Sequence, residues 1–182
     1  MSECHPHPST RGHTLTEALL VIALFGGLLA SGIPSLQAYL LRRHLQGQSA
    51  QWLADLQYLR ASAIGRNEPL RLSWLRGGGG SGWAIHSGDA DACRADGDAA
   101  QPIRCTGGAA LLRSAWLPAG SRVVVQANVA SMRVDPRQGT VTPTGSWELA
   151  TPDGVRLRHV VNLLGRARVC TPASPVTGVA AC

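Results

Sequence analysis

The sequence predicts an α+β protein in which a long N-terminal helix packs on an antiparallel β-sheet body. Three features of the 182-residue chain lead to this expectation. Residues 14–33 are almost entirely apolar, and large apolar residues then recur at helical spacing to about residue 62. Beyond them, residues 66–182 alternate short apolar segments with turn residues, in a chain that holds 21 glycines and 11 prolines.

The first part of the predicted helix has the character of a membrane span. The apolar run is about twenty residues long, which is the length that crosses a bilayer as a helix. Glu17 is the charged residue within the run, where a carboxylate is costly. Pro34 follows directly and lacks a backbone N–H, so we expect a helix kink there. We assign residues 13–34 to this transmembrane part.

An amphipathic continuation of the helix is expected over residues 35–65. Glycine and proline close it at Gly65 and Pro69. Its apolar face is made of Leu36, Leu40, Leu41, Leu45, Trp52, Leu53, Leu56 and Leu59. A cleaved secretory signal is the alternative, because residues 29–32 (Leu-Ala-Ser-Gly) loosely fit its small-residue cleavage motif. The helix that continues past Pro34 favours a retained segment, since a cleaved signal needs no helix fused to its end.

The body, residues 66–182, is predicted to be strand-rich. Alternating residues at 70–75 and 83–86 predict two strands, and the glycine run at 77–80 predicts the turn between them. The run lacks the lysine and the following helix of a phosphate-binding loop. Further strands are predicted at 122–127, 131–135, 139–142, 146–150, 155–162 and 166–170.

Composition argues against catalysis. All seventeen basic residues are arginine, against eleven acidic residues, for a net charge of +6. Without lysine, a Schiff-base site, a P-loop and a kinase site are excluded. The histidines have no adjacent carboxylate or serine motif, and no G-x-S-x-G or H-E-x-x-H occurs. We therefore expect no enzyme activity, no catalytic residue, no cofactor and no metal.

The N-terminus resembles the class III signal of type IV pilins and pseudopilins. The resemblance rests on Gly12, on the His-Thr-Leu-Thr-Glu sequence that follows it, and on the apolar run after that. The resemblance implies that a prepilin peptidase removes the leader, residues 1–12, and that the new N-terminus, His13, is methylated. The family usually has phenylalanine at that position. Glu17 would then be the fifth residue of the mature chain, and in the family this glutamate contacts the amine of a neighbouring subunit during assembly. Pro34 would be the twenty-second residue, where the family has a proline that loosens the helix.

The body resembles the GspH/FimT family of minor pilins. The resemblance rests on residues 58–64, 82–85, 139–143 and 164–170, the last being typical of the FimT/FimU branch. It implies a minor pilin that contributes to type IV pilus assembly or to the pilus tip. Its expected partners are other major and minor pilins or pseudopilins, the prepilin peptidase and inner-membrane lipid. Its expected location is the inner membrane, single-pass with the body in the periplasm, and then the pilus or cell surface.

Two other functions stay open on the sequence. One is a GspH-like minor pseudopilin of a type II secretion system, which has the same architecture. The other is an unrelated secreted or membrane-anchored β-rich domain.

The cysteines indicate an oxidising compartment. Cys4 lies in the predicted leader, which leaves four cysteines and three possible pairings. The twelve-residue spacings favour Cys93–Cys105 and Cys170–Cys182 as local disulfide loops. A zinc site is disfavoured because no C-x-x-C pair occurs.

Four arginines near the C-terminus are candidates for binding double-stranded DNA during natural transformation. Two alternate on one predicted strand and two on the next, so a hairpin could present all four guanidiniums on one face. Guanidinium groups bind phosphate in a bidentate manner. Asp153 is the acidic residue that we expect to oppose them. FimT-like proteins in some competent bacteria bind DNA through a Gly-Arg-x-Arg stretch, which residues 165–168 match. The candidates are Arg156, Arg158, Arg166 and Arg168.

An acidic loop is a weaker candidate for calcium. Asp89, Asp91, Asp96 and Asp98 lie close together in the sequence. A calcium ion takes six or more oxygens, and this loop lacks the terminal glutamate of the twelve-residue calcium loop. A solvated acidic loop is the interpretation we adopt.

Overall fold

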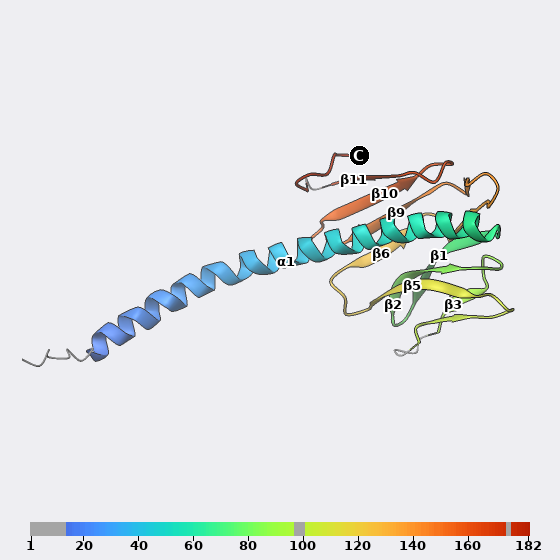
Figure 1. The fold of residues 1–182 in the computed structure, drawn as a ribbon. Coiled ribbons are helices and arrows are strands. Elements are labelled where there is room, and N and C mark those ends of the chain that lie inside the picture. The colour runs from blue at the N-terminus through green and yellow to red at the C-terminus, as the bar shows by residue number, and fades with distance from the viewer. Residues whose placement is uncertain (1–13, 97–100, 174–175) are drawn as a thin grey trace, which may run out of the picture. The chain divides into compact units, whose positions relative to one another are not determined.

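The computed structural model describes residues 14–96, 101–173 and 176–182, with only the backbone described at 28–32 and 34. The chain forms two compact units, residues 1–40 and 41–182. One helix, α1 (Leu15–Arg66), begins in the first unit and ends in the second (Figure 1). All strands belong to the second unit.

Both ends of α1 are capped by local hydrogen bonds. At the start, Thr14 Oγ1 accepts from the backbone N–H of Glu17 at 3.3 Å, so Thr14 caps the N-terminus of the helix. At the end, Asn67 adopts a left-handed conformation, with φ of 49°. The backbone N–H groups of Asn67 and Glu68 then donate to the carbonyls of Ile64 and Ala63, which closes the helix in a Schellman motif.

Side chains in the first unit of the structure are largely exposed. Leu15, Leu20 and Phe25 are examples, each more than half exposed. Among the described residues, no helix combines the length and apolar character needed to cross a membrane. The transmembrane role of residues 13–34 therefore stays a prediction.

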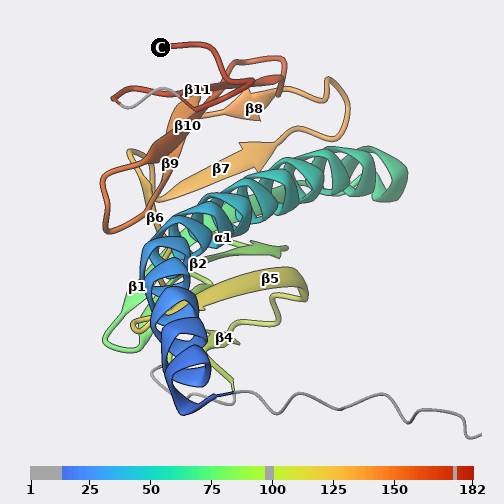
Figure 2. The same ribbon diagram turned by 90° about the vertical axis from the view of Figure 1, so that its left-hand side faces the viewer.

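The second unit contains two larger antiparallel sheets and a two-stranded ribbon (Figures 1 and 2). The first sheet has the order β5-β2-β1-β7-β8: Leu111–Pro118, Gly80–His86, Leu70–Gly77, Ser131–Val134 and Val141–Thr142. The second has the order β11-β10-β9-β6: Ala167–Cys170, Arg156–Val161, Gly145–Ala150 and Val124–Ala127. The ribbon pairs β3 (Cys93–Ala95) with β4 (Ile103–Cys105).

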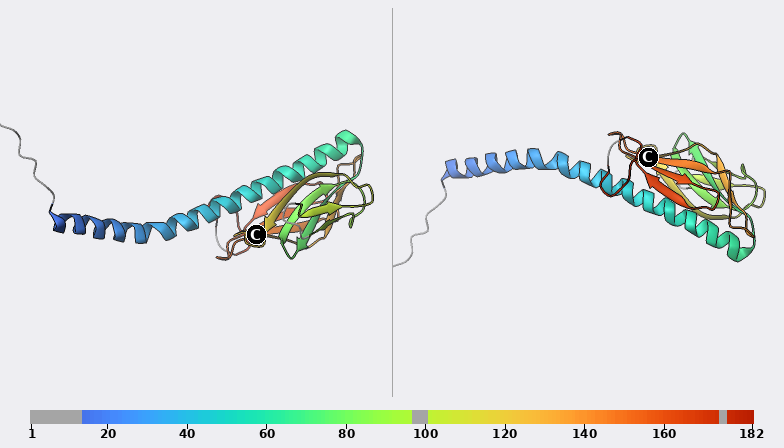
Figure 3. Two further views of the ribbon diagram at one scale, coloured as in Figure 1. Left: turned by 90° about the horizontal axis from the view of Figure 1, so that it is seen from below. Right: turned by 90° about the horizontal axis from the view of Figure 1, so that it is seen from above.

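One hydrophobic core joins the second half of α1 to both sheets, and Figure 3 shows this half lying along the strands. Trp52 of α1 packs against Trp147 of β9, with ring centroids 5.5 Å apart. Asp55, also on α1, accepts a 2.8 Å hydrogen bond from Trp83 Nε1 on β2 and pairs with Arg113 of β5. The helix contributes Leu45, Trp52, Leu56, Leu59 and Ala63 to this core.

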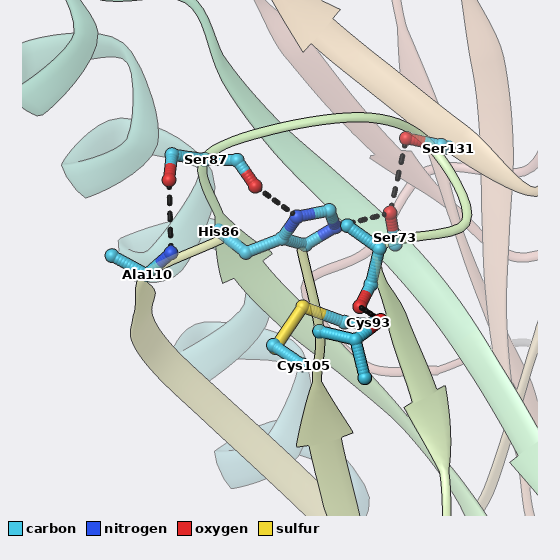
Figure 4. The surroundings of a disulfide bond; sticks show 9 residues. Ser73, His86, Ser87, Cys93, Cys105, Ala110 and Ser131 are labelled. Atoms are coloured by element: carbon cyan, nitrogen blue, oxygen red, sulfur yellow. Dashed lines mark hydrogen bonds between the residues drawn. A yellow bond between two sulfur atoms is a disulfide. The ribbon is translucent and has the colours of Figure 1, made fainter. Parts of the chain in front are cut away.

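A second, smaller core lies under the β3–β4 ribbon. It contains Leu75, Ala84, Cys93 and Ile103, and the Cys93–Cys105 disulfide ties the ribbon together (Figure 4). Beside the disulfide, the ring of His86 lies between Ser73 Oγ and the backbone carbonyl of Ser87, each at 2.8 Å (Figure 4). Burial lowers the pKa of His86 below its ordinary value. This histidine and Ser73 are fully buried, so the pair stabilises the sheet and is closed to a substrate.

The predicted α+β class, with a helix packed on antiparallel sheets, is confirmed. Strand predictions locate most of the two larger sheets but miss β3, β4 and β5. In β5, Arg113 and Ser114 interrupt the apolar pattern because this strand lies at the sheet edge and only one of its residues is buried. The short strands β3 and β4 depend on a disulfide and on packing against another strand, which local alternation does not encode.

Candidate functional site in the C-terminal hairpin

Strands β10 and β11 form a hairpin whose two faces differ in character. Along β10, Leu157, His159 and Val161 are buried, whereas Arg156 and Val160 are exposed and Arg158 is half-buried. Alternation along a strand sends successive side chains to opposite faces, so both arginines of β10 lie on the outer face. The outer face is the candidate binding surface.

Arg168 lies on the same outer face, in the neighbouring strand. It is directly opposite Val160 in the β10–β11 register, and opposed residues share a face. Arg166 lies one step before β11, where its backbone carbonyl accepts from Asn162 N–H at 3.1 Å. Both side chains are exposed. The hairpin therefore brings the four predicted arginines together on one side of the sheet.

Glu148 of β9 neutralises part of this charge. It is directly opposite Arg158 in the β9–β10 register. Its carboxylate pairs with Arg156 at 3.3 Å and with Arg158 at 3.0 Å. The prediction that Asp153 is the counter-charge of these arginines is wrong. The β9–β10 register places Glu148 beside them instead. The signal was available in the sequence, since an antiparallel pair of strands at 146–150 and 155–162 aligns these residues.

Arg166 and Arg168 differ from the first pair. Within the described parts of the chain, neither guanidinium forms an ion pair or a hydrogen bond with another side chain. Their positive charge is therefore directed to solvent without a local counter-charge. Of the four candidates, these two are the better placed to bind an external anion.

The inner face of the hairpin adds no charge at neutral pH. His159 Nε2 lies 2.8 Å from Ser49 Oγ of α1, and the ring packs on Trp52 with centroids 4.7 Å apart. Burial lowers the pKa of His159 to about 4, since the charged form would lose its hydration. The imidazole is thus neutral, and it joins β10 to the helix.

The four body cysteines form the two disulfides that the spacing favours. Cys93 pairs with Cys105, and Cys170 pairs with Cys182. Cys170 is opposite Arg158 at the end of β11, so its disulfide attaches the C-terminal segment beside the arginine face.

The other predicted site residues lie away from the hairpin. Gly12 and His13 are outside the described residues. Glu17 is in the first turn of α1, and Pro34 lies within the helix. In the acidic loop, Asp91 pairs with Arg94 and Asp96 with Arg104, whereas Asp98 is outside the described residues. In the described parts of the chain, no group of three or more histidine, cysteine or acidic side chains could hold a metal ion.

The fold and the hairpin define a helix-bearing, disulfide-linked β-sheet protein with a basic surface patch. Comparison with known proteins gives its family. The model of the family described as type II transport protein GspH matches residues 48–165, well over half of the chain. The chain belongs to the GspH family, and it is a protein of the minor pilin or pseudopilin kind. The match ends at Gly165, so Arg166 and Arg168 follow directly after it.

A solved structure of the type IV minor pilin FimU from Pseudomonas aeruginosa (strain PAO1) is also similar. It has 20% sequence identity and a TM-score of 0.49, and the similarity covers 73% of this chain and 96% of that chain. No curated protein matches this chain.

Proposed function

We propose that this protein is a minor pilin of a type IV pilus that binds double-stranded DNA through its C-terminal hairpin. Membership of the GspH family supports the role in a filament, whose expected partners are other major and minor pilins. The observation that supports DNA binding is the exposed, unpaired state of Arg166 and Arg168 beside two further arginines. Guanidinium groups in a row would follow a phosphate backbone without reading base sequence.

The N-terminus is proposed to anchor and assemble the subunit. A prepilin peptidase would cut between Gly12 and His13, and His13 would be methylated. Residues 13–34 would then span the inner membrane, where Pro34 kinks the helix and Glu17 meets the amine of a neighbouring subunit. The body would lie in the periplasm before its assembly into the pilus, in agreement with disulfides that need an oxidising compartment.

N-terminal sequencing of the mature protein tests the anchoring proposal. A chain that begins at methylated His13 would support it. A chain that begins near Ile33 would instead show cleavage of an ordinary secretory signal.

DNA binding is tested by a gel shift across a salt series, with the full-length oxidised chain in a non-ionic detergent. The variant Arg166→Ala/Arg168→Ala is compared with Arg42→Ala/Arg43→Ala, which removes the same charge from α1. We expect the hairpin variant to bind roughly tenfold or more weakly near 100 mM salt and to lower the salt slope by about 2, because each lost phosphate contact removes about 0.9. Equal weakening by both variants would show a general charge effect, and an absence of binding at low salt would refute the DNA role.

The second candidate is a minor pseudopilin of a type II secretion system, which the description of the matching family favours. Deletion of the gene distinguishes the two machines. Loss of pilus formation or DNA uptake supports the pilus, whereas accumulation of secreted enzymes in the periplasm supports the secretion system.

A further inference from the structure

The turn between β10 and β11 exposes two adjacent large apolar side chains. Leu163 is 52% exposed and Leu164 is 55% exposed. A single exposed leucine is ordinary on a protein surface, but two at the tip of a hairpin form a small apolar protrusion. We refer to Leu163 and Leu164 as the leucine tip. Arg166 follows this tip by two residues, so the tip belongs to the same hairpin as the candidate DNA site.

Backbone hydrogen bonds fix the turn that carries the leucine tip. Within the hairpin, Gly165 N–H donates to the Asn162 carbonyl at 2.9 Å, and Arg166 N–H donates to Asn162 Oδ1 at 2.9 Å. From outside the hairpin, Val141 N–H donates to the Leu163 carbonyl at 2.8 Å. The leucines are therefore held by an ordered turn.

Close packing against the helix restricts the turn further. Gly165 has a φ of 67°, in the left-handed region that favours glycine. A Cβ atom there would lie 2.6 Å from Cδ of Arg60 on α1 and 2.9 Å from Cγ2 of Val141. Arg60 and Val141 occupy the space on the inner side of the turn, so the turn cannot move inward. The leucine tip is therefore held in its exposed position before any ligand binds.

The surroundings of the leucine tip are positively charged. Arg166 and Arg168 follow the tip by two and four residues, without a counter-charge among the described residues, and Arg60 packs against Gly165 of the turn. An apolar protrusion flanked by cations matches a ligand that is anionic outside and apolar within. Duplex DNA has this arrangement, because its phosphates flank stacked bases, and leucine is among the residues that proteins insert between base steps.

We infer that Leu163 and Leu164 enter a base step of duplex DNA as a wedge while Arg166 and Arg168 hold the adjacent phosphates. The inference rests on the proposed DNA binding and adds a deformation of the bound duplex to it. Such a wedge favours steps that unstack readily, such as TA, so it gives a shape preference without hydrogen bonds to bases.

Base unstacking tests the wedge directly. The probe is a short duplex of repeated TA steps that carries 2-aminopurine, whose fluorescence rises when its stacking is lost. It is titrated with the full-length chain in a non-ionic detergent. We expect the wild-type protein to raise the fluorescence roughly twofold or more. Leu163→Ala/Leu164→Ala should remove this rise, yet lower the affinity by about tenfold at most and keep the salt slope, because the phosphate contacts remain.

Two control variants separate the possible outcomes. Leu111→Ala truncates an exposed leucine on β5 of the other sheet and should retain the rise. Arg166→Ala/Arg168→Ala should weaken binding roughly tenfold or more, and the fluorescence rise should decrease with it. Wild-type binding without a rise, or a rise that survives in the double leucine variant, would overturn the wedge while DNA binding stands.

Two further results would also overturn the inference. If the wild-type chain does not bind the duplex at low salt, the proposed DNA function itself fails. If the leucine variant keeps the fluorescence rise but no longer binds another pilin subunit, the leucine tip is a protein contact instead.

Discussion

The two faces of strand β10 show how one segment serves both the fold and a surface. On the inner face, Leu157, His159 and Val161 are buried against α1 and the rest of the core. On the outer face, Arg156, Arg158 and Val160 contact mainly solvent and Glu148. Packing restricts every inner residue, whereas the outer residues are restricted only by charge and strand propensity. Substitutions on the two faces should therefore change different properties.

The largest expected effect is a difference in stability loss between a substitution on the inner face of β10 and one on the outer face. Leu157→Ala removes a fully buried side chain, and we expect a loss of about 3 kcal/mol in the free energy of unfolding. Val160→Ala, three residues further along the strand on the outer face at 42% exposure, should cost less than about 1 kcal/mol. Urea unfolding of the oxidised protein measures both values, and similar losses would contradict the assignment of faces.

A smaller effect is expected from pH, because His159 on the inner face titrates and changes the free energy of unfolding. His159 has a pKa of about 4 when folded and near 6.5 when unfolded, so the unfolded state binds more protons between these values. Its contribution to stability is complete above pH 6.5 and decreases as pH falls toward 4. Between pH 7.5 and 5 we expect a loss of about 2 kcal/mol.

Unfolding of wild type and His159→Gln at the two pH values isolates this contribution. The variant keeps His86, whose lowered pKa acts in the same direction, so the difference between the two proteins belongs to His159. Parallel pH profiles would show that His159 is not held neutral by the core.

The smallest effect concerns the outer face alone. Glu148→Gln would release Arg156 and Arg158 from their ion pairs, so that all four arginines could contact phosphate. We expect about tenfold tighter DNA binding at low salt and a steeper salt slope, measured by the same gel shift. Glu68→Gln, which removes an equal charge near the end of α1, is the matched control. An unchanged slope in Glu148→Gln would place the first arginine pair outside the DNA contact.

The sequence predicts the second unit well where periodicity is strong. Leucines at helical spacing and the strands at 70–75 and 146–150 fall within observed elements. The exposed edge strand β5 has no clean alternation, and the ribbon β3–β4 has only three residues in each strand. Such elements depend on neighbours that are distant in sequence, which explains why local patterns miss them.

For the candidate site too, some features follow from the residues alone and others follow from contacts between distant segments. The amino-acid residues alone are enough to predict the α+β class, the family resemblance, the two twelve-residue cysteine loops and a group of four arginines near the C-terminus. Tertiary structure decided which arginines are neutralised, because the β9–β10 register places Glu148 beside Arg156 and Arg158. It also decided the rigid, outward presentation of Leu163 and Leu164, since Arg60 and Val141 meet the turn only in the folded chain. Charge and propensity are properties of single residues, whereas pairing and exposure depend on contacts between distant segments.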